Sequence, residues 1–435
     1  MEQPTFYLES YGCSANTANA EMISGILESA GMLRVSSPEH ASVIIINTCI
    51  VKAPTEHKMQ RRISEISAQF PEKKLIISGC MPDAEGKTLK KIAPKAILLG
   101  SHHVKKVLEA LTRGRSFTGY SEEVKLGLPR HLSNPAICIV PISEGCLGNC
   151  SYCIVKLAKG KLHSYPVNEI VKEVKSGLRA GAREIWITSQ DNSAYGRDLA
   201  EKSQLPMLLE EVTSIRGKFW VRVGMMNPDG ILPVLDSLIL RFRSEKVFKF
   251  IHIPVQSGND EILRRMRRRY SVEDFKHIIT EFRRKIPRIT ISTDIICGFP
   301  GETEEQFEDS INLIKWLRPD VLNISRFWPM PGTEAASMKN ILNGNITKHR
   351  SQKLSRIFEG IALEKNKAEI GSECPVLVDE HIKENLYVAR TEFYKPVSLR
   401  IDRRMLGQKK VLGSFARARI TGATSNSLIG ELVEY

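Results

Sequence analysis

The sequence lacks a long apolar run and lacks the pattern of a secretory leader. A membrane-spanning helix needs about 18 to 20 consecutive apolar residues, and no stretch of this chain reaches that length. The first residues, MEQPTFYLESYGC, contain no basic segment followed by an apolar one, as a signal peptide would. We therefore expect a cytoplasmic protein without a membrane partner.

Acidic residues are scarce relative to basic ones. The 435 residues include 63 Lys and Arg but only 49 Asp and Glu, which gives a formal net charge of +14. Such an excess favours a polyanionic partner such as RNA or DNA, with a generic basic surface as the alternative. The length predicts two to four domains, because one hydrophobic core rarely serves a chain of this size.

The N-terminal third has the pattern of an α/β domain. Residues 1–114 alternate β-rich runs at 5–11, 42–48 and 74–79 with helix-like segments. This alternation predicts a parallel sheet with right-handed crossovers. Residues 115–134 lose the periodicity, so we interpret them as a connector.

Two further domains are predicted after the connector. Residues 135–370 contain six apolar β-rich runs separated by amphipathic segments. Near-continuous apolar strands are typical of parallel sheets buried on both faces, and six units predict a partial barrel, not a closed eight-unit one. Residues 371–435 contain five short β-rich runs broken by turns, which predict a small β-barrel of the kind that often binds oligonucleotides.

Three of the nine cysteines lie in one tight loop, SEGCLGNCSYC, directly after the first strand of the predicted partial barrel. Cys146, Cys150 and Cys153 can bind three irons of a [4Fe–4S] cluster and leave the fourth iron open. An open position is what a catalytic metal centre needs. Gly145 and Gly148 would let the backbone wrap around a cluster without a clash from a Cβ atom.

A second set of cysteines follows three successive strands of the N-terminal domain. Cys13, Cys49 and Cys80 end the segments YLESYGC, IIINTC and LIISGC. Ligands of open parallel sheets bind beyond the carboxyl ends of the strands. We therefore predict that these three thiols converge on a second cluster, although any one alone is more often a small buried hydrophobe.

Other interpretations of the cysteines are weaker. A structural zinc site needs four ligands, and the nearest histidine to the triplet, His163, has no partner at zinc-finger spacing. For Cys138, Cys297 and Cys374 we expect buried structural thiols.

These motifs carry a family resemblance that covers essentially the whole chain. CLGNCSYC resembles the cluster motif of the radical S-adenosylmethionine superfamily. The upstream YGC, NTC and SGC, together with a β-barrel tail, resemble the methylthiotransferases, which join a cluster domain, a partial-barrel radical domain and an RNA-binding TRAM domain. The stretches YGCSAN, NTCIVKAPTEHKM, SGCMP, GKLHSYP, TSQDNSAYGRDL and TDIICGFPGET resemble the archaeal and eukaryotic branch that acts on threonylcarbamoyladenosine in tRNA.

The resemblance implies a radical reaction on tRNA with two [4Fe–4S] clusters and two S-adenosylmethionine molecules per turnover. The triplet cluster would cleave S-adenosylmethionine, and the resulting radical would remove hydrogen from C2 of N6-threonylcarbamoyladenosine at position 37. The second cluster would carry the sulfur, so that the product is 2-methylthio-N6-threonylcarbamoyladenosine. An electron donor and a sulfur donor are further implied partners.

Polar residues at other strand ends of the partial barrel are candidates for binding S-adenosylmethionine. They are Ser189, Gln190, Asp191, Arg222 and Gln256. Residues in such places are also routinely loop caps, and this alternative stays open.

Arginines are candidates for phosphate contacts with an anticodon loop, whose single-stranded bases are accessible. They are Arg264, Arg265, Arg267, Arg268, Arg269, Arg417 and Arg419. The alternative for the tract at 264–269 is a solvated helix face.

One departure from the family pattern lies near the triplet. The Ala-Arg-Gly expected after the cluster motif is Ala158-Lys159-Gly160, which keeps the positive charge but loses the planar guanidinium. Alternative functions are methylthiolation of isopentenyladenosine or of a ribosomal-protein aspartate, or, in another class, a non-catalytic iron–sulfur RNA-binding or redox-sensing protein.

Overall fold

A computed structural model describes residues 3–50, 53–402 and 411–434. The chain divides into two compact units, which are described separately. Unit 1 comprises Met1–Ser133, Ile139–Glu173 and Trp328–Ala336, and unit 2 comprises Asn134–Cys138, Val174–Phe327 and Ser337–Tyr435. Within the described part of the chain, no helix has the length and apolar character needed to cross a membrane.

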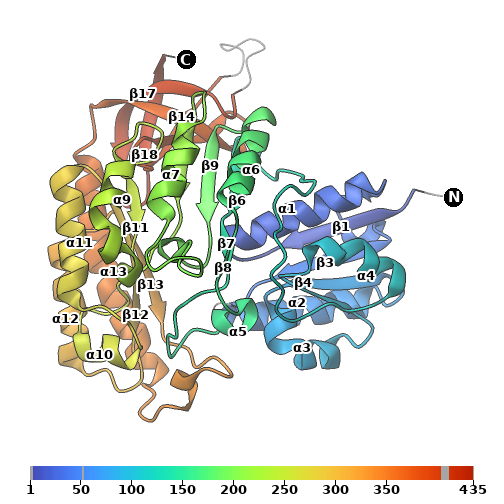
Figure 1. Ribbon diagram of the computed structural model, residues 1–435. Coiled ribbons are helices and arrows are strands. Elements are labelled where there is room, and N and C mark those ends of the chain that lie inside the picture. The colour runs from blue at the N-terminus through green and yellow to red at the C-terminus, as the bar shows by residue number, and fades with distance from the viewer. Residues whose placement is uncertain (1–2, 51–52, 403–410, 435) are drawn as a thin grey trace. The chain divides into compact units, whose positions relative to one another are not determined.

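Unit 1 contains a parallel sheet with strand order β2-β1-β3-β4-β5 (Figure 1). Its strands are β1 (Thr5–Ser10), β2 (Leu33–Arg34), β3 (Val43–Thr48), β4 (Lys74–Gly79) and β5 (Ile97–Gly100). Its helices are α1 (Ser14–Ser29), α2 (Ala53–Gln69), α3 (Met81–Ile92) and α4 (Val107–Arg113). The three predicted strands are confirmed, and the register pairs Thr48 with Gly79, so the carboxyl ends of β3 and β4 lie level.

The connector crosses α1 at very close range. A Cβ atom on Gly25 would lie 2.4 Å from the backbone of Pro129 and Arg130. Glu21, one turn earlier, accepts a hydrogen bond at its carbonyl from the His131 N–H (3.0 Å), and its Oε1 accepts one from the Ser133 N–H (3.0 Å). The connector therefore packs as part of the domain even though its sequence has no periodicity.

We expect Gly25→Ala to destabilise the protein although it improves helix propensity. Alanine gains about 1 kcal/mol over glycine in a helix interior, but a methyl group pressed against fixed backbone costs about 1–3 kcal/mol or more. Gly360→Ala is the matched control, because Gly360 is an exposed helical glycine with nothing within 4 Å of its Cβ position. Thermal unfolding should show a lower midpoint for Gly25→Ala and an equal or higher one for Gly360→Ala.

Residues 143–164, directly after the first strand of the partial barrel, form three short elements of unit 1. They are β7 (Ser143–Glu144), α5 (Val155–Lys159) and β8 (His163–Ser164). Strands β7 and β8 pair antiparallel and close the loop that carries the cysteine triplet.

The six strands predicted for the partial barrel are all present. They are β6 (Ile137–Pro141), β9 (Glu184–Thr188), β10 (Trp220–Val223), β11 (Phe250–His252), β12 (Thr290–Cys297) and β13 (Val321–Arg326). They form two sheets with orders β10-β9-β6 and β11-β12-β13, and the pairs β9–β10, β11–β12 and β12–β13 are parallel. β6 begins in unit 2 and ends in unit 1.

Helices connect these strands in the expected alternation (Figure 1). They are α6 (Val167–Arg179), α7 (Leu205–Ser214), α8 (Pro228–Ile231), α9 (Leu235–Phe242), α10 (Asp260–Arg265), α11 (Val272–Lys285) and α12 (Glu304–Leu317). The starts of α11 and α12 are fixed by capping boxes, in which Ser271 and Thr303 accept hydrogen bonds from the third residue of each helix.

The C-terminal strands close into the predicted barrel, with order β14-β15-β16-β18-β17. They are β14 (Glu373–Lys383), β15 (Leu386–Thr391), β16 (Pro396–Arg400), β17 (Phe415–Ala423) and β18 (Leu428–Glu434); Tyr435, included in the prediction, lies outside the described residues. Trp220 and Phe248, at the amino ends of β10 and β11, form an apolar cluster with Leu377 and Phe415 of this barrel. The barrel thus packs at the end of the strands opposite to their carboxyl ends.

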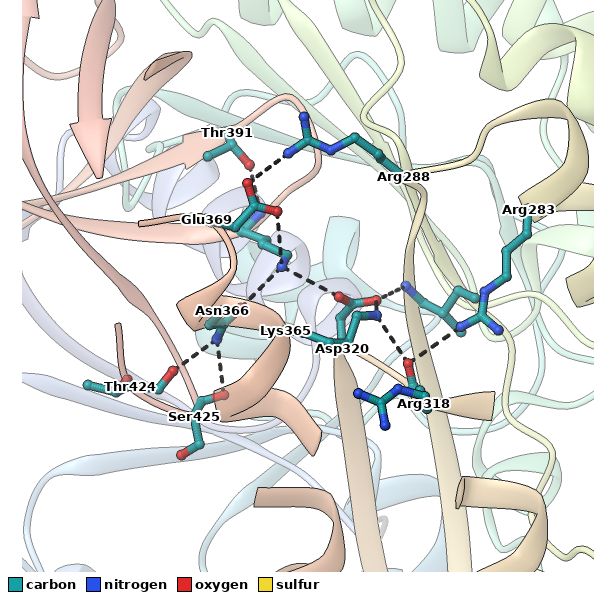
Figure 2. Close-up of polar contacts among 12 residues, drawn as sticks. Arg283, Arg288, Arg318, Asp320, Lys365, Asn366, Glu369, Thr391, Thr424 and Ser425 are labelled. Carbon is teal, nitrogen blue, oxygen red and sulfur yellow. Dashed lines mark hydrogen bonds and ion pairs between the residues drawn. The ribbon is translucent and has the colours of Figure 1, made fainter. Parts of the chain in front are cut away.

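Helix α13 (Gly344–Lys367) leads into the barrel, and ion pairs fix the junction (Figure 2). Asp320 forms ion pairs with Lys365 (2.7 Å) and with Lys395 (3.6 Å). Glu369 pairs with Lys395 (3.7 Å) and Arg288 (2.7 Å). Asp320 and both lysines are largely buried, so this network ties the partial barrel, α13 and the small barrel into one unit.

Candidate functional site

The triplet Cys146, Cys150 and Cys153 lies in the loop between β7 and α5, and all three thiols are partly accessible. The Gly148 N–H donates to Cys146 Sγ (3.2 Å). The Lys156 ammonium donates to the Cys146 carbonyl (2.8 Å), and the Cys153 N–H donates to the Cys150 carbonyl (3.2 Å). The loop is therefore folded by its own hydrogen bonds, and its three cysteines stay partly accessible.

The glycines of this loop suit a cluster. A Cβ atom on Gly148 would lie 3.3 Å from Cys146 Sγ and 3.6 Å from Cys150 Sγ, inside the cradle formed by the two sulfurs. Gly145 has a φ of 75°, and a Cβ atom there would lie 1.8 Å from the Lys161 carbonyl oxygen. Two of the three sulfurs thus face one cradle, and a loop with three such thiols can hold a cubane that keeps one iron free.

The strand-end cysteines Cys13, Cys49 and Cys80 follow β1, β3 and β4, as predicted. Cys13 and Cys80 are the residues that precede α1 and α3, and the Cys80 N–H donates to the Thr48 carbonyl (3.1 Å). A Cβ atom on Gly12 would lie 2.9 Å from Cys49 Sγ, which places the Cys13 loop against Cys49. The level strand ends thus bring the three cysteines to one edge of the sheet.

The three thiols also interact electrostatically. Burial raises the pKa of Cys80 to about 12; Lys159 opposes this shift, and Cys13 and Cys49 add to it. The free thiol is thus neutral, whereas a metal ligand loses its proton. Within the described ranges, no group of three or more His, Cys, Asp or Glu is gathered closely enough to hold one metal ion. Thiolates of a cubane bind different irons and lie further apart than the ligands of one ion, so the cluster predictions stand.

Both cysteine sets belong to unit 1, and α5 links them. α5 begins two residues after Cys153 and packs against α3, which begins one residue after Cys80. Ile154 and Ala158 share an apolar core cluster with Cys80 and Met330. The short helix α5 therefore connects the loop of Cys146, Cys150 and Cys153 to the second set of cysteines.

Three charged residues that the sequence interpretation did not single out as a site are buried beside this helix. We call Lys125, Glu144 and Lys159 the buried charge group, and their side chains are at most 3% exposed. Glu144 pairs with Lys125 through Oε1 and with Lys159 through Oε2 (3.0 Å). Lys125 also donates to Asn19 Oδ1 (2.9 Å), and His102 Nε2 lies 3.2 Å from the Lys159 carbonyl.

The charges of this group follow from burial and mutual attraction. Burial opposes the ionisation of Glu144, but the two lysines outweigh it and lower its pKa to about 2. Burial lowers the pKa of Lys125 to about 8 despite Glu144, and it lowers the pKa of His102. Burial acts against Lys159 too, but Glu144, Cys80 and Cys13 raise its pKa. At neutral pH the group holds two ammonium ions and one carboxylate.

Three of the five candidates for S-adenosylmethionine binding have buried polar atoms without a hydrogen-bond partner among the described residues. These atoms are Ser189 Oγ, Gln190 Oε1 and Arg222 Nε. The Arg222 guanidinium lies over the ring of Trp186 (5.1 Å) and that of Tyr394 (5.3 Å). A buried polar atom without a partner is costly, so Ser189 and Gln190 fit a polar ligand. Arg222 instead faces Tyr394 of the C-terminal barrel, at the end of the strands opposite to their carboxyl ends.

The other two candidates differ from each other. Asp191 is 6% exposed, and its carboxylate accepts from Ser193 N (3.0 Å) and from Asn227 Nδ2 (2.7 Å). Its side chain is therefore a loop cap, the alternative considered for such positions. Gln256 has a φ of 73°, and its N–H donates to the Asp294 carbonyl (2.8 Å). A left-handed non-glycine backbone at a strand end is typical of functional loops. Ligand binding by either residue remains a prediction.

The arginine tract at 264–269 splits into two groups. Arg265 and Arg268 are half-buried; Arg265 donates to the Pro300 carbonyl, and Arg268 donates to Tyr270 Oη (2.8 Å). These two hold neighbouring loops. The exposed members are Arg264, Arg267 and Arg269.

Arg417 and Arg419 project from β17 into solvent, with side chains 50% and 58% exposed. Both lie near Glu373, at 3.9 Å and 2.7 Å. Exposed pairs are weak, so both guanidinium groups can exchange Glu373 for a phosphate. RNA contact by any of these arginines remains a prediction.

The three cysteines outside the two sets behave as structural thiols. Cys138 and Cys297 are at most 2% exposed, and burial raises the pKa of Cys297 to about 12. Burial also raises the pKa of the partly buried Cys374 to about 11.

Comparison with known proteins agrees with this geometry. Residues 140–314 match the Radical SAM superfamily, residues 5–100 match Uncharacterized protein family UPF0004, and residues 367–433 match the TRAM domain. A probable threonylcarbamoyladenosine tRNA methylthiotransferase of Pyrococcus horikoshii is 40% identical over 98% of this chain and 99% of its own. The chain belongs to the threonylcarbamoyladenosine tRNA methylthiotransferase family. The human threonylcarbamoyladenosine tRNA methylthiotransferase is 35% identical over 90% of this chain and 68% of its own.

Solved structures support the fold of this methylthiotransferase. The radical S-adenosylmethionine methyltransferase TsrM from Kitasatospora setae, solved with cobalamin and a [4Fe–4S] cluster, covers 77% of each chain with a TM-score of 0.57. Sequence identity is 14%, so this likeness concerns the fold alone.

Proposed function

We propose that this chain inserts a methylthio group at C2 of N6-threonylcarbamoyladenosine at position 37 of tRNA. The observation that carries the proposal is the pair of cysteine sets joined by α5 within one unit, in a chain that matches its relatives from end to end. A non-catalytic redox sensor would have no need for a six-unit partial barrel with a cluster loop that leaves one iron open.

The protein residues would divide the work between the two sets. Cys146, Cys150 and Cys153 would hold the cluster that keeps one iron open, and the strand-end cysteines would hold the second. When bound, these clusters and S-adenosylmethionine supply the 5′-deoxyadenosyl radical, the inserted sulfur and the methyl group. In this proposal the cysteines and the surrounding polar residues bind and orient these cofactors and keep water away from them.

Residues of unit 2 would bind S-adenosylmethionine and RNA. The unpartnered atoms of Ser189 and Gln190 would receive its polar groups, while Asp191 would shape the loop. Exposed arginines at 264, 267, 269, 417 and 419 would contact phosphates, with a salt-dependent affinity. A cytoplasmic location, an electron donor and a sulfur donor complete the proposal.

The deciding experiment is nucleoside mass spectrometry of tRNA from a strain that lacks this chain. We expect 2-methylthio-N6-threonylcarbamoyladenosine to disappear and its unmethylthiolated precursor to accumulate, with recovery when the gene is restored. An unchanged level of the methylthio nucleoside in the deletion strain would overturn the proposal. Purified enzyme should also convert anticodon stem-loops that carry threonylcarbamoyladenosine and leave those with isopentenyladenosine unchanged.

A further inference from the structure

The buried charge group has an unbalanced charge. Lys125 comes from the connector, Glu144 ends β7 and Lys159 ends α5, and all three lie inside unit 1. Two ammonium ions and one carboxylate leave one net positive charge away from water. Such a charge is costly unless an opposite charge lies nearby.

Among the described residues, no second carboxylate forms an ion pair with either lysine; Asp83, which acts on His102, accepts instead from the Ser101 and Gly119 N–H groups. The remaining contacts of Lys125 are the neutral Asn19 Oδ1 (2.9 Å) and the Ser101 carbonyl (3.1 Å). His102, whose Nε2 lies 3.2 Å from the Lys159 carbonyl, brings no negative charge either. The described residues give neither lysine a second carboxylate. The surplus positive charge therefore fits an anion bound next to this group.

The second cysteine set is the neighbour that could supply this anion. Ala158, next to Lys159, packs in the same core cluster as Cys80 and the first residue of α3, Met81. Helix α5, which ends at Lys159, also packs against α3, which follows Cys80 directly. A [4Fe–4S] cluster in its usual oxidised state, bound by three thiolates, carries one net negative charge, which equals the surplus.

We propose that the buried charge group is the counter-charge of a cluster at Cys13, Cys49 and Cys80, and that it raises the reduction potential of that cluster. This inference rests on the second cluster of the proposed function. Reduction adds an electron, and a fixed positive charge in a dry interior stabilises the reduced form more than the oxidised form. Lys159 is then a positioning and tuning residue for the second cluster.

The test uses the full chain with Cys146, Cys150 and Cys153 replaced by alanine, so that only the second set can hold iron. After anaerobic reconstitution with iron and sulfide, bound iron is quantified and the midpoint potential is measured by EPR-monitored titration. Lys159→Met should lower the ratio of reduced to oxidised cluster at least tenfold at a fixed potential, a shift of about 59 mV for one electron. Lys125→Met should shift the midpoint potential in the same direction, and the potential of Lys159→Arg should stay near that of the parent.

Lys161→Met is the matched control, because Lys161 lies two residues further on and is exposed, so the potential should not move. Absence of iron in the parent would refute the second cluster itself. If folded Lys159→Met and Lys125→Met proteins bind the cluster with an unchanged potential, the second cluster is supported but the counter-charge proposal is overturned. If circular dichroism shows that the Lys159→Met protein is unfolded, the potential of the Lys125→Met protein decides the question. Unfolding of both variants would show that the buried charge group serves structure alone, and this result would also overturn the inference.

Discussion

Cys150→Ala is expected to reduce both 5′-deoxyadenosine release and methylthiolation to background. Cys150 is the central member of the triplet, and its Sγ shares the Gly148 cradle with Cys146 Sγ. With two thiolates left in the loop, a cubane has no stable three-point attachment. The measurement is anaerobic incubation of reconstituted enzyme with dithionite, S-adenosylmethionine and tRNA, followed by mass spectrometry of both products.

Cys49→Ala is expected to separate the two products. The loss of a strand-end thiol should stop methylthiolation and spare 5′-deoxyadenosine release, because the triplet loop is folded by its own hydrogen bonds. Cys374→Ala is the control, since this thiol lies in the C-terminal barrel, and it should keep both products. Methylthiolation retained in Cys49→Ala would contradict the division of labour. Loss of 5′-deoxyadenosine from a folded Cys49→Ala protein would show that the two sets act as one.

Most of the fold follows from strand periodicity. The buried run of β3 and the six apolar runs of the partial barrel need both faces covered, and this requirement makes parallel strands recognisable. The strands that escaped prediction are short: β2, β7 and β8 have two residues each, and β5 has four. β11 is shorter than its apolar run predicts, because Phe248 packs against the C-terminal barrel and Pro254 has no N–H for a ladder.

Candidate site residues are easiest to predict where chemistry restricts the residue type. Three cysteines at equivalent strand ends serve few purposes besides metal binding, whereas an aspartate at a strand end serves equally well as a ligand or as a cap. Asp191 is a cap because Asn227, far along the chain, donates to it. Only the fold brings such partners together.

The buried charge group could not be predicted from local sequence. Lysines are almost never fully buried, and Lys125 lies in a segment without periodicity, so nothing local marks it as interior. Its pairing with Glu144 arises from contacts between separate segments of the chain. The one available signal was Lys159, which replaces the arginine of the family pattern next to the cluster motif.

Arg350→Met is expected to cause the largest loss of stability, about 3–5 kcal/mol, because it leaves a buried charge without its partner. Arg350, on α13, pairs with Glu302 (2.8 Å) in the loop after β12, and their side chains are 5% and 1% exposed. Glu302 also accepts from the Gly298 N–H (2.7 Å). The pair therefore fastens the loop at the carboxyl end of β12 to α13.

The matched control and the pH dependence distinguish this pair from an ordinary ion pair. Lys353→Met, one turn further along α13, breaks an exposed pair with Glu308 (2.8 Å) and should cost about 0–1 kcal/mol. Burial already raises the pKa of Glu302, against the Gly298 N–H and Arg350, and the loss of Arg350 raises it further. A carboxyl group whose folded pKa lies above its unfolded value destabilises the fold as pH rises through that folded pKa. The deficit of Arg350→Met, measured by thermal unfolding, should therefore shrink as the pH is lowered from 8 to 5. A loss of stability equal to that of Lys353→Met, or one that does not change with pH, would contradict this prediction. It would mean that water solvates the Glu302 carboxylate once Arg350 is gone.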